Sequence, residues 1–100
     1  MQANVINSGQ NVAIRLQGRF DFNTHRDFRA AVDTALQASQ PQLSVDFGGV
    51  DYLDSSALGM LLMLRDKART ANKTVSLVNC HGSVRQILDI ANFSKLFSIS

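Results

Sequence analysis

Two adjacent serines, Ser55 and Ser56, follow an aspartate where the sequence changes from a strand pattern to a helix pattern. Asp54 and the serines are residue types that cap helix N-termini, where backbone N–H groups have no partner within the helix. A phosphate is also well tolerated there, because these N–H groups and the positive end of the helix dipole favour an anion. The triplet therefore indicates either a simple helix cap, which is the commoner explanation, or a hydroxyl that can be phosphorylated.

The elements on either side of this triplet follow from hydrophobic periodicity. Alternation of apolar and polar residues predicts a strand over 42–47, which Gly48-Gly49 is expected to end. An apolar run with good helix formers predicts a helix over 56–70. The serines are thus expected in the connection between a strand and the helix that follows it.

The rest of the chain predicts an alternation of strands and helices. Strands are expected at 5–6, at 12–17 with an end at Gly18, at 74–78 and at Ile99. Helices are expected at 24–39, with Thr24 as the cap, and at 83–90, with Ser83 as the cap. Such alternation requires crossover connections, so the central strands should be at least partly parallel. We predict a single domain over 1–100 of the α/β class, a small mixed β-sheet of about four to five strands with about three to four helices.

The position of the serines in this sheet bears on their role. The segment 42–78 forms one right-handed strand–helix–strand unit, whose first turn carries Ser55 and Ser56. Ligand and reaction sites of such sheets lie at the carboxyl ends of the strands. This placement favours a functional role for the serines over capping alone.

The predicted helix over 56–70 has more apolar residues than one face can hold. The stripe expected to face the sheet consists of Leu58, Leu61, Leu62 and Ala68. Met60, Met63 and Leu64 fall largely on the other side of the helix. Two interpretations remain open: these side chains contact neighbouring helices, or they form an interface with a partner protein, for which flexible methionines are well suited.

Composition excludes several classes of protein. A hydrophobic content of 45% is incompatible with a disordered chain, and a net charge of +2 with scattered Lys and Arg gives no reason to expect nucleic acid or an anionic membrane as partner. The longest apolar run, 57–64, is much shorter than the ~18 residues of a membrane span, and no N-terminal signal is visible. The single cysteine, Cys80, allows no internal disulfide and is expected to be a buried, inert thiol at a strand end. We therefore predict a cytoplasmic domain.

Two segments resemble a known family. Segment 18–21, Gly-Arg-Phe-Asp, follows a predicted strand, and segment 52–59, Tyr-Leu-Asp-Ser-Ser-Ala-Leu-Gly, precedes a predicted helix. Together they resemble the STAS domain, and more narrowly the free-standing bacterial anti-sigma factor antagonists, over residues 5–99. The family pattern has glycine where this chain has Ala57, a mild departure at the first turn of a helix.

The resemblance implies a phosphorylation switch. By position the acceptor is Ser55, phosphorylated by an anti-sigma factor with serine kinase activity and dephosphorylated by a PP2C-type phosphatase. The unphosphorylated protein would bind the anti-sigma factor and free the sigma factor. Asp21 matches the acid that lies near this serine at the kinase interface, and Ser56 is expected to bond backbone at the helix start. The predicted partner-binding residues are Asp21, Asp54, Ser56, Met60, Met63 and Leu64.

Two alternatives concern other binding or signalling proteins. A phosphoaspartate receiver could use Asp54, but the predicted first strand is followed by Asn7-Ser8 and not by the acidic pair that such proteins need for Mg²⁺. An accessory subunit of a lipid-transport ABC system could share the domain, although such subunits usually lack a phosphorylatable serine at the position of Ser55. The output could also be a non-transcriptional process such as biofilm control.

An enzyme is the third class, and the sequence does not favour it. His25 and His81 are predicted in separate loops without a nucleophile pattern, and Ser55 is not in a G-x-S-x-G elbow. No spacing typical of metal ligands occurs. We therefore predict no catalytic residues, no metal and no cofactor.

Overall fold

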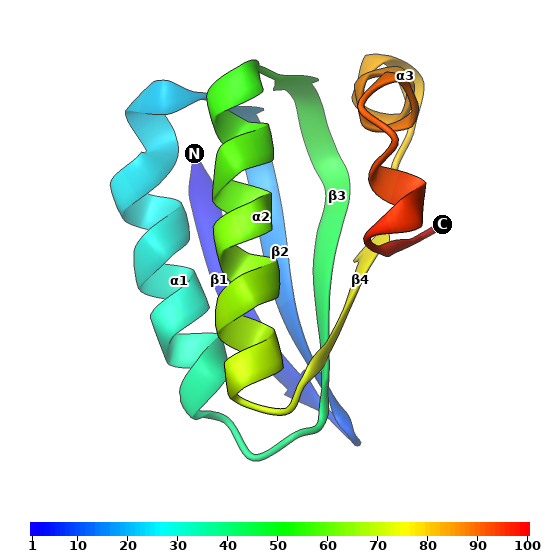
Figure 1. Ribbon diagram of the computed structural model, residues 1–100. Helices are drawn as coiled ribbons and strands as arrows, with labels where there is room; N and C mark the ends of the chain where they lie inside the picture. The colour runs from blue at the N-terminus through cyan, green and yellow to red at the C-terminus, as the bar shows by residue number, and fades with distance from the viewer.

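Five strands form one mixed sheet, in the order in which they occur along the chain (Figure 1). The computed structural model describes residues 1–100. The strands are β1 (Gln2–Ser8), β2 (Asn11–Phe20), β3 (Gln42–Leu53), β4 (Thr74–Val78) and β5 (Ser98–Ile99). β1 pairs antiparallel with β2, and the pairs from β2 to β5 are all parallel. This sheet, together with three α-helices, confirms the predicted fold class.

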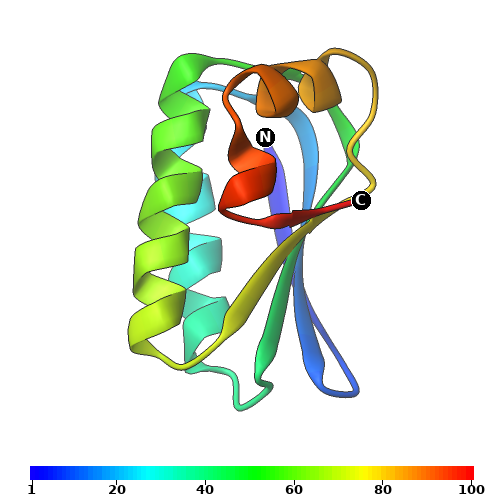
Figure 2. The ribbon, with the colours of Figure 1, turned by 45° about the vertical axis from the view of Figure 1, so that its right-hand side comes forward.

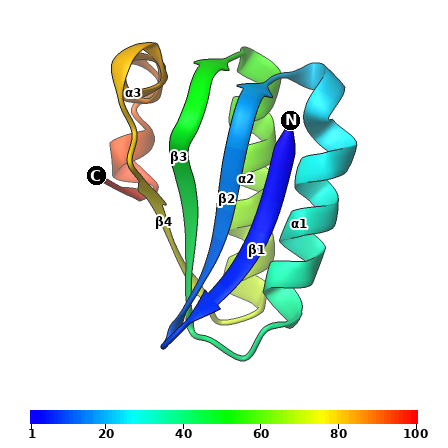
Figure 3. The same cartoon turned by 180° about the vertical axis from the view of Figure 1, so that it is seen from behind.

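The helices leave one face of the sheet open. They are α1 (His25–Gln37), α2 (Ser55–Thr70) and α3 (Gly82–Ile90), with short 3₁₀ turns η1 (Phe22–Thr24) and η2 (Phe93–Lys95). α1 and α2 lie side by side over the same face, and the view from behind shows the strands without helices in front of them (Figure 3). α3 packs against β3 near the end from which α2 begins (Figure 2). None of the helices combines the length and apolar character needed to cross a bilayer.

Both long strands continue through glycines at which the sequence predicted an end. β2 passes through Gly18, which has φ +103°, and β3 passes through Gly48-Gly49 to reach Leu53. The pairing of β2 with β3 shifts register near these glycines, so they mark bulges. A Cβ at Gly49 would lie 2.9 Å from the carbonyl oxygen of Leu16, and the close approach of the two strands therefore requires glycine. The predicted ends were wrong because a bulge depends on the neighbouring strand.

Two predicted helix caps were also wrong in detail. Thr24 occupies the predicted N-cap position of α1 but makes no side-chain cap bond. Its hydroxyl oxygen accepts from the backbone N–H of Asp21 (3.1 Å), and its hydroxyl donates to the carbonyl of Asp21 (2.7 Å). Ser83 lies inside α3, where its hydroxyl donates to the carbonyl of Asp51 (3.3 Å), and His81 has the N-cap position. In both cases the hydroxyl bonds backbone groups that lie before the helix.

α2 buries a stripe that matches the predicted one at Leu61 and Ala68 but differs from it elsewhere. Its buried residues are Ala57, Met60, Leu61, Leu64 and Ala68. Leu62, predicted to face the sheet, is 37% exposed, whereas Leu64, predicted on the outer side, is fully buried. Residues 57–64 are nearly all apolar, so periodicity alone does not fix the rotation of the helix. Packing of α2 against both the sheet and α1 fixes it instead.

Candidate functional site

The carboxylate of Asp54 joins the start of α2 to η1. Asp54 is the N-cap of α2, which begins at Ser55, one residue earlier than predicted. Its Oδ1 accepts hydrogen bonds from the backbone N–H of Ala57 (3.0 Å) and from the Ser56 hydroxyl (2.6 Å). Its Oδ2 accepts from the backbone N–H of Phe22 in η1 (3.2 Å). One side chain therefore holds together two loops that are 32 residues apart in the chain.

These hydrogen bonds also set the charge of Asp54. The bond from the Ser56 hydroxyl, followed by bonds from the backbone N–H groups of Ala57, Phe22 and Ser56, lowers the pKa of Asp54 below its ordinary value of 3.8. Partial desolvation raises the pKa but does not outweigh them. The carboxylate is therefore ionised at neutral pH, and both of its oxygens accept hydrogen bonds from groups of the same chain.

The two serines have different surroundings. Ser56 is half-buried and its hydroxyl is engaged by Asp54, so the prediction that it bonds backbone was wrong. Ser55 is exposed at the first position of α2, and its hydroxyl takes part in no hydrogen bond within the chain. Of the two serines, only Ser55 therefore has a hydroxyl that is both exposed and unbonded.

Asp21 lies in the neighbouring loop, at the carboxyl end of β2. Its Oδ1 accepts from the backbone N–H of Asn23 (3.0 Å) as the cap of η1, and its Oδ2 lies 3.6 Å from Nε of Arg19. Arg19 in turn lies over the ring of Tyr52, 4.1 Å from its centroid. The backbone N–H of Asp54 donates to the carbonyl of Phe20 (3.3 Å), which brings the ends of β2 and β3 together. As expected for parallel neighbours, Asp21 and Asp54 thus follow adjacent strands at one edge of the sheet.

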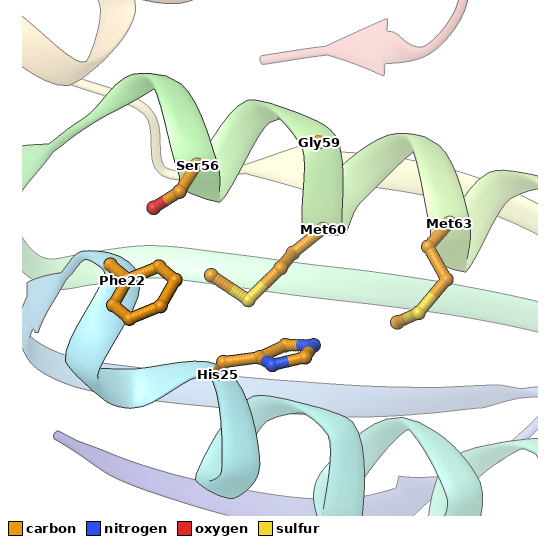
Figure 4. A pocket seen from close by; sticks show the side chains of 6 residues that line it. All are labelled: Phe22, His25, Ser56, Gly59, Met60 and Met63. Atoms are coloured by element: carbon orange, nitrogen blue, oxygen red, sulfur yellow. The ribbon is translucent and has the colours of Figure 1, made fainter.

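An apolar pocket of about 260 Å³ lies beside these loops, between the start of α1 and the first turns of α2 (Figure 4). Its lining residues are Phe22, His25, Ser56, Gly59, Met60 and Met63. Phe22 is 73% exposed, so its ring is accessible beside the pocket. Phe22 and His25 are not among the site residues predicted from the sequence. The available signal was a phenylalanine in a loop directly after Asp21.

The predicted partner-binding residues of α2 divide into two groups. Leu64 is fully buried and Met60 is 6% exposed, so both belong to the core and their predicted outer placement was wrong. Met60 still lines the pocket, as does the half-exposed Met63 (Figure 4). The structure therefore supports the interpretation that Met60 contacts the neighbouring helix, and it leaves Met63 accessible.

Comparison with known proteins identifies the family. The model described as "Mlab, STAS domain" matches residues 4–98. The chain belongs to the STAS domain family. A STAS-domain containing protein of Pseudomonas aeruginosa (strain UCBPP-PA14) is 51% identical over 92 residues, which make up 92% of this chain and 90% of that protein.

Solved structures show the same STAS fold. The anti-sigma factor antagonist SpoIIAA in its unphosphorylated form has a TM-score of 0.80 at 21% identity, covering 98% of this chain and 87% of that chain. The Bacillus cell fate determinant SpoIIAA in the phosphorylated form has a TM-score of 0.72 at 20% identity, covering 98% of this chain and 90% of that chain. At these identities the similarity extends to the fold and not to individual residues.

The remaining candidate residues of this STAS domain lie apart from one another. His25 is the exposed first residue of α1 and His81 precedes α3, so His25 lies in a helix and not in the loop predicted for it. Cys80 is half-buried two residues beyond β4, and burial raises the pKa of its thiol to about 11. No group of three His, Cys, Asp or Glu side chains is placed to hold a metal ion.

Proposed function

We propose that this STAS domain is an anti-sigma factor antagonist in a partner-switching pathway, controlled by phosphorylation of Ser55. The observation that carries the proposal is the contrast between the two serines. Ser55 has an exposed, unbonded hydroxyl at the first position of α2, whereas the hydroxyl of Ser56 donates to Asp54 at 2.6 Å. Of these two serines, Ser55 is therefore the one available to a kinase that approaches this edge of the sheet.

Phosphorylation at Ser55 is compatible with the folded state. The first N–H groups of a 16-residue helix and the positive end of its dipole would stabilise the phosphate. No buried group has to move, because the Ser55 side chain is already in solvent. We therefore expect the phosphorylated and unphosphorylated proteins to have the same fold and to differ at the surface.

The surface change is electrostatic. A phosphoserine adds about −1.5 to −2 charge at neutral pH. At Ser55 that charge would lie next to the ionised carboxylate of Asp54 and on the same edge as Asp21. Concentrated negative charge raises the desolvation cost of a complex and repels acidic groups of a partner, so the phosphorylated protein releases its partner.

The unphosphorylated protein offers an apolar anchor beside Ser55. Phe22 projects from η1 with most of its side chain in solvent, and Met63 lines the adjoining pocket. Large apolar side chains of this kind supply most of the binding energy of an interface. We assign partner contact to Asp21, Phe22 and Met63, and we assign Asp54 and Ser56 to positioning, since their polar atoms bond one another and η1.

The comparisons support this assignment at the level of the fold. SpoIIAA, which is similar in structure, is described as an anti-sigma factor antagonist and is known in unphosphorylated and phosphorylated forms. By analogy, the partners here are an anti-sigma factor with serine kinase activity and a PP2C-type phosphatase, and the pathway operates in the cytoplasm. The phosphoryl-transfer chemistry belongs to these partners, and the domain itself acts as a regulator and not as an enzyme.

The test is capture of partners from the source cell with the tagged native protein, Ser55→Ala and Ser55→Asp. We expect the native protein and Ser55→Ala to retain a serine kinase that Ser55→Asp does not retain. When the captured kinase is incubated with ATP, it should phosphorylate the native protein at Ser55. It should phosphorylate the Ser56→Ala variant with the same efficiency. Phosphate found only on Ser56 would contradict the assignment.

The same capture separates the proposal from its alternatives. Recovery of the ATPase of a lipid-transport ABC system, with no kinase, would support the accessory-subunit function instead. Recovery of the kinase without any sigma factor in its complexes would still support control by phosphorylation of Ser55. It would indicate that the regulated process is not transcription. Equal capture by Ser55→Ala and Ser55→Asp would rule out charge at Ser55 as the control.

A further inference from the structure

Arg19 and Tyr52 form a cation–π pair beside the proposed phosphorylation site. They are register partners on the adjacent strands β2 and β3, and the guanidinium of Arg19 lies 4.1 Å from the centroid of the Tyr52 ring. Arg19 is three residues before Phe22, and Tyr52 is three residues before Ser55. The pair therefore belongs to the same edge of the sheet as this serine and the exposed phenylalanine.

Both side chains lie on the face of the sheet that the helices leave open (Figure 3). Successive side chains of a strand point to opposite faces. Phe20 and Leu53, the next residues along the two strands, are buried in the core, so Arg19 and Tyr52 point away from it. The side chain of Arg19 is 64% exposed and Tyr52 is 39% exposed. The pair is thus accessible to a protein that binds at this edge.

The guanidinium of Arg19 is held in place while its donors stay free. Arginine has five N–H donors in a planar fork that matches the two oxygens of a carboxylate. Those of Arg19 make no hydrogen bond within the chain, whereas Nε of Arg65 and Nε of Arg85 each make one or more. The ion-pair partner of Arg19, Asp21, lies 3.6 Å from Nε, which is too far for a hydrogen bond. Stacking on Tyr52 therefore presents an ordered fork whose hydrogen bonds another molecule can supply.

We propose that Arg19, stacked on Tyr52, binds a carboxylate of the anti-sigma factor when Ser55 is unphosphorylated, an inference that rests on the function proposed above. Charge complementarity identifies the occupant, because a cation with unfilled donors attracts an anionic group and the planar fork pairs with two oxygens at once. On a protein partner, such a group is the side chain of Asp or Glu. Arginine and tyrosine are also among the residue types that most often dominate the binding energy of an interface.

This contact gives phosphorylation a specific group to act on. A phosphate on Ser55 would add about −1.5 to −2 charge at the edge where the partner's carboxylate binds. The phosphate would repel that carboxylate and would also weaken the attraction that Arg19 exerts on it. The acidic residue of the partner is thus the group whose binding depends on the state of Ser55.

Calorimetric titration with the captured kinase tests the proposal, in a Ser55→Ala background that cannot be phosphorylated at this position. Arg19→Gln should weaken binding roughly tenfold and Arg19→Glu should weaken it further. Arg19→Lys should recover only part of the loss, because it keeps the charge without the planar fork. Tyr52→Leu, which removes the ring, should weaken binding more than Tyr52→Phe, which keeps it. Added NaCl should weaken binding less in Arg19→Gln than in the parent protein, a difference that a purely structural role would not produce.

The matched control is Arg15→Gln. Arg15 also lies on β2, its side chain is 55% exposed and its Nε lies 3.7 Å from Asp46, but it is in the middle of the strand and not at the edge with Ser55. It should bind the kinase with the affinity of the parent protein. Urea denaturation of each variant separates lost affinity from lost folding.

The outcomes distinguish this inference from the function on which it rests. If the Ser55→Ala protein retains the kinase and Arg19→Glu binds it equally well, the role of Arg19 is overturned and the proposed function stands. An Arg19→Gln variant with reduced stability and normal affinity would assign Arg19 to the fold and would also overturn the inference. If the Ser55→Ala protein retains no kinase, the proposed function fails and this inference fails with it.

Discussion

The two ends of α2 use polar side chains in opposite ways. At the C-terminal end, Lys73 is 8% exposed and its Nζ donates to the carbonyls of Ala38 (2.6 Å) and Gln40 in the connection after α1. At the N-terminal end, Asp54 binds η1, but the adjacent Ser55 hydroxyl is exposed and unbonded. The buried Lys73 has its partners within the fold, whereas the hydroxyl of Ser55 has none. Substitutions at the two ends should therefore change different measured quantities.

Lys73→Met should have the largest effect on stability. The substitution keeps the length of the side chain but leaves the carbonyls of Ala38 and Gln40 without their charged donor, at an expected cost of about 2 kcal/mol in unfolding free energy. Urea denaturation measures this cost, and Lys95→Met, which changes an exposed lysine, is the control. Partner affinity of the folded protein should not change. Normal stability in Lys73→Met would show that the hydrogen bonds of Lys73 do not stabilise the fold.

Phe22→Ala should weaken partner binding by roughly 30-fold, or about 2 kcal/mol, because it removes a large exposed anchor beside Ser55. The unfolding free energy should stay within about 0.5 kcal/mol of the native value, since the side chain is 73% exposed. Affinity is measured by calorimetry with the captured kinase. Ile90→Ala, 82% exposed on α3, is the control and should bind normally. A large loss of stability in Phe22→Ala would instead assign Phe22 to the fold.

Asp54→Ala should destabilise the protein by about 1 kcal/mol, because it removes the cap of α2 and the acceptor for η1. The effect depends on pH. Since the folded-state pKa of Asp54 is lowered, its stabilisation is present above the ordinary value of 3.8 and is lost as pH falls through the folded value. The difference in unfolding free energy between native protein and variant should therefore be constant from neutral pH down to about 5 and shrink below 4. A difference that grows on acidification would contradict the lowered pKa.

Ser55→Asp should have the smallest effect on stability, less than about 0.5 kcal/mol in either direction, because an acid at the start of a helix is tolerated. Ser55→Asp should nonetheless weaken partner binding. Thermal unfolding compares it with Ser55→Ala. If Ser55→Asp unfolded the domain, a switch based on stability would have to replace one based on the surface.

Helices and strands were predicted best from the sequence where local signals were complete. The strand over 74–78 was predicted with its observed bounds, and the start of α2 was predicted within one residue. The different environments of Ser55 and Ser56 could not be predicted in full, because Ser56 lines a pocket with Phe22 and His25, which are distant in the sequence. The family was confirmed, while the roles assigned to individual site residues remain predictions.

The errors share a physical cause, which is that contacts between elements decided what local patterns left open. Gly48-Gly49 indicates a strand end when considered alone, but beside β2 it permits a close approach and β3 continues. The rotation of α2 was undetermined along an apolar run, and packing on α1 and the sheet turned Leu64 inward. Phe22 was not selected because its exposure is a property of the folded surface.

The bonds of Lys73 have a consequence for the order in which the protein assembles. They join residues 35 and 33 positions apart, so the connection after α1 has no partner until β3 and α2 have been synthesised. Closing a loop of that length costs entropy before any contact repays it. During synthesis on the ribosome, the carbonyls of Ala38 and Gln40 should therefore stay hydrated until Lys73 has been added to the chain and has folded against them.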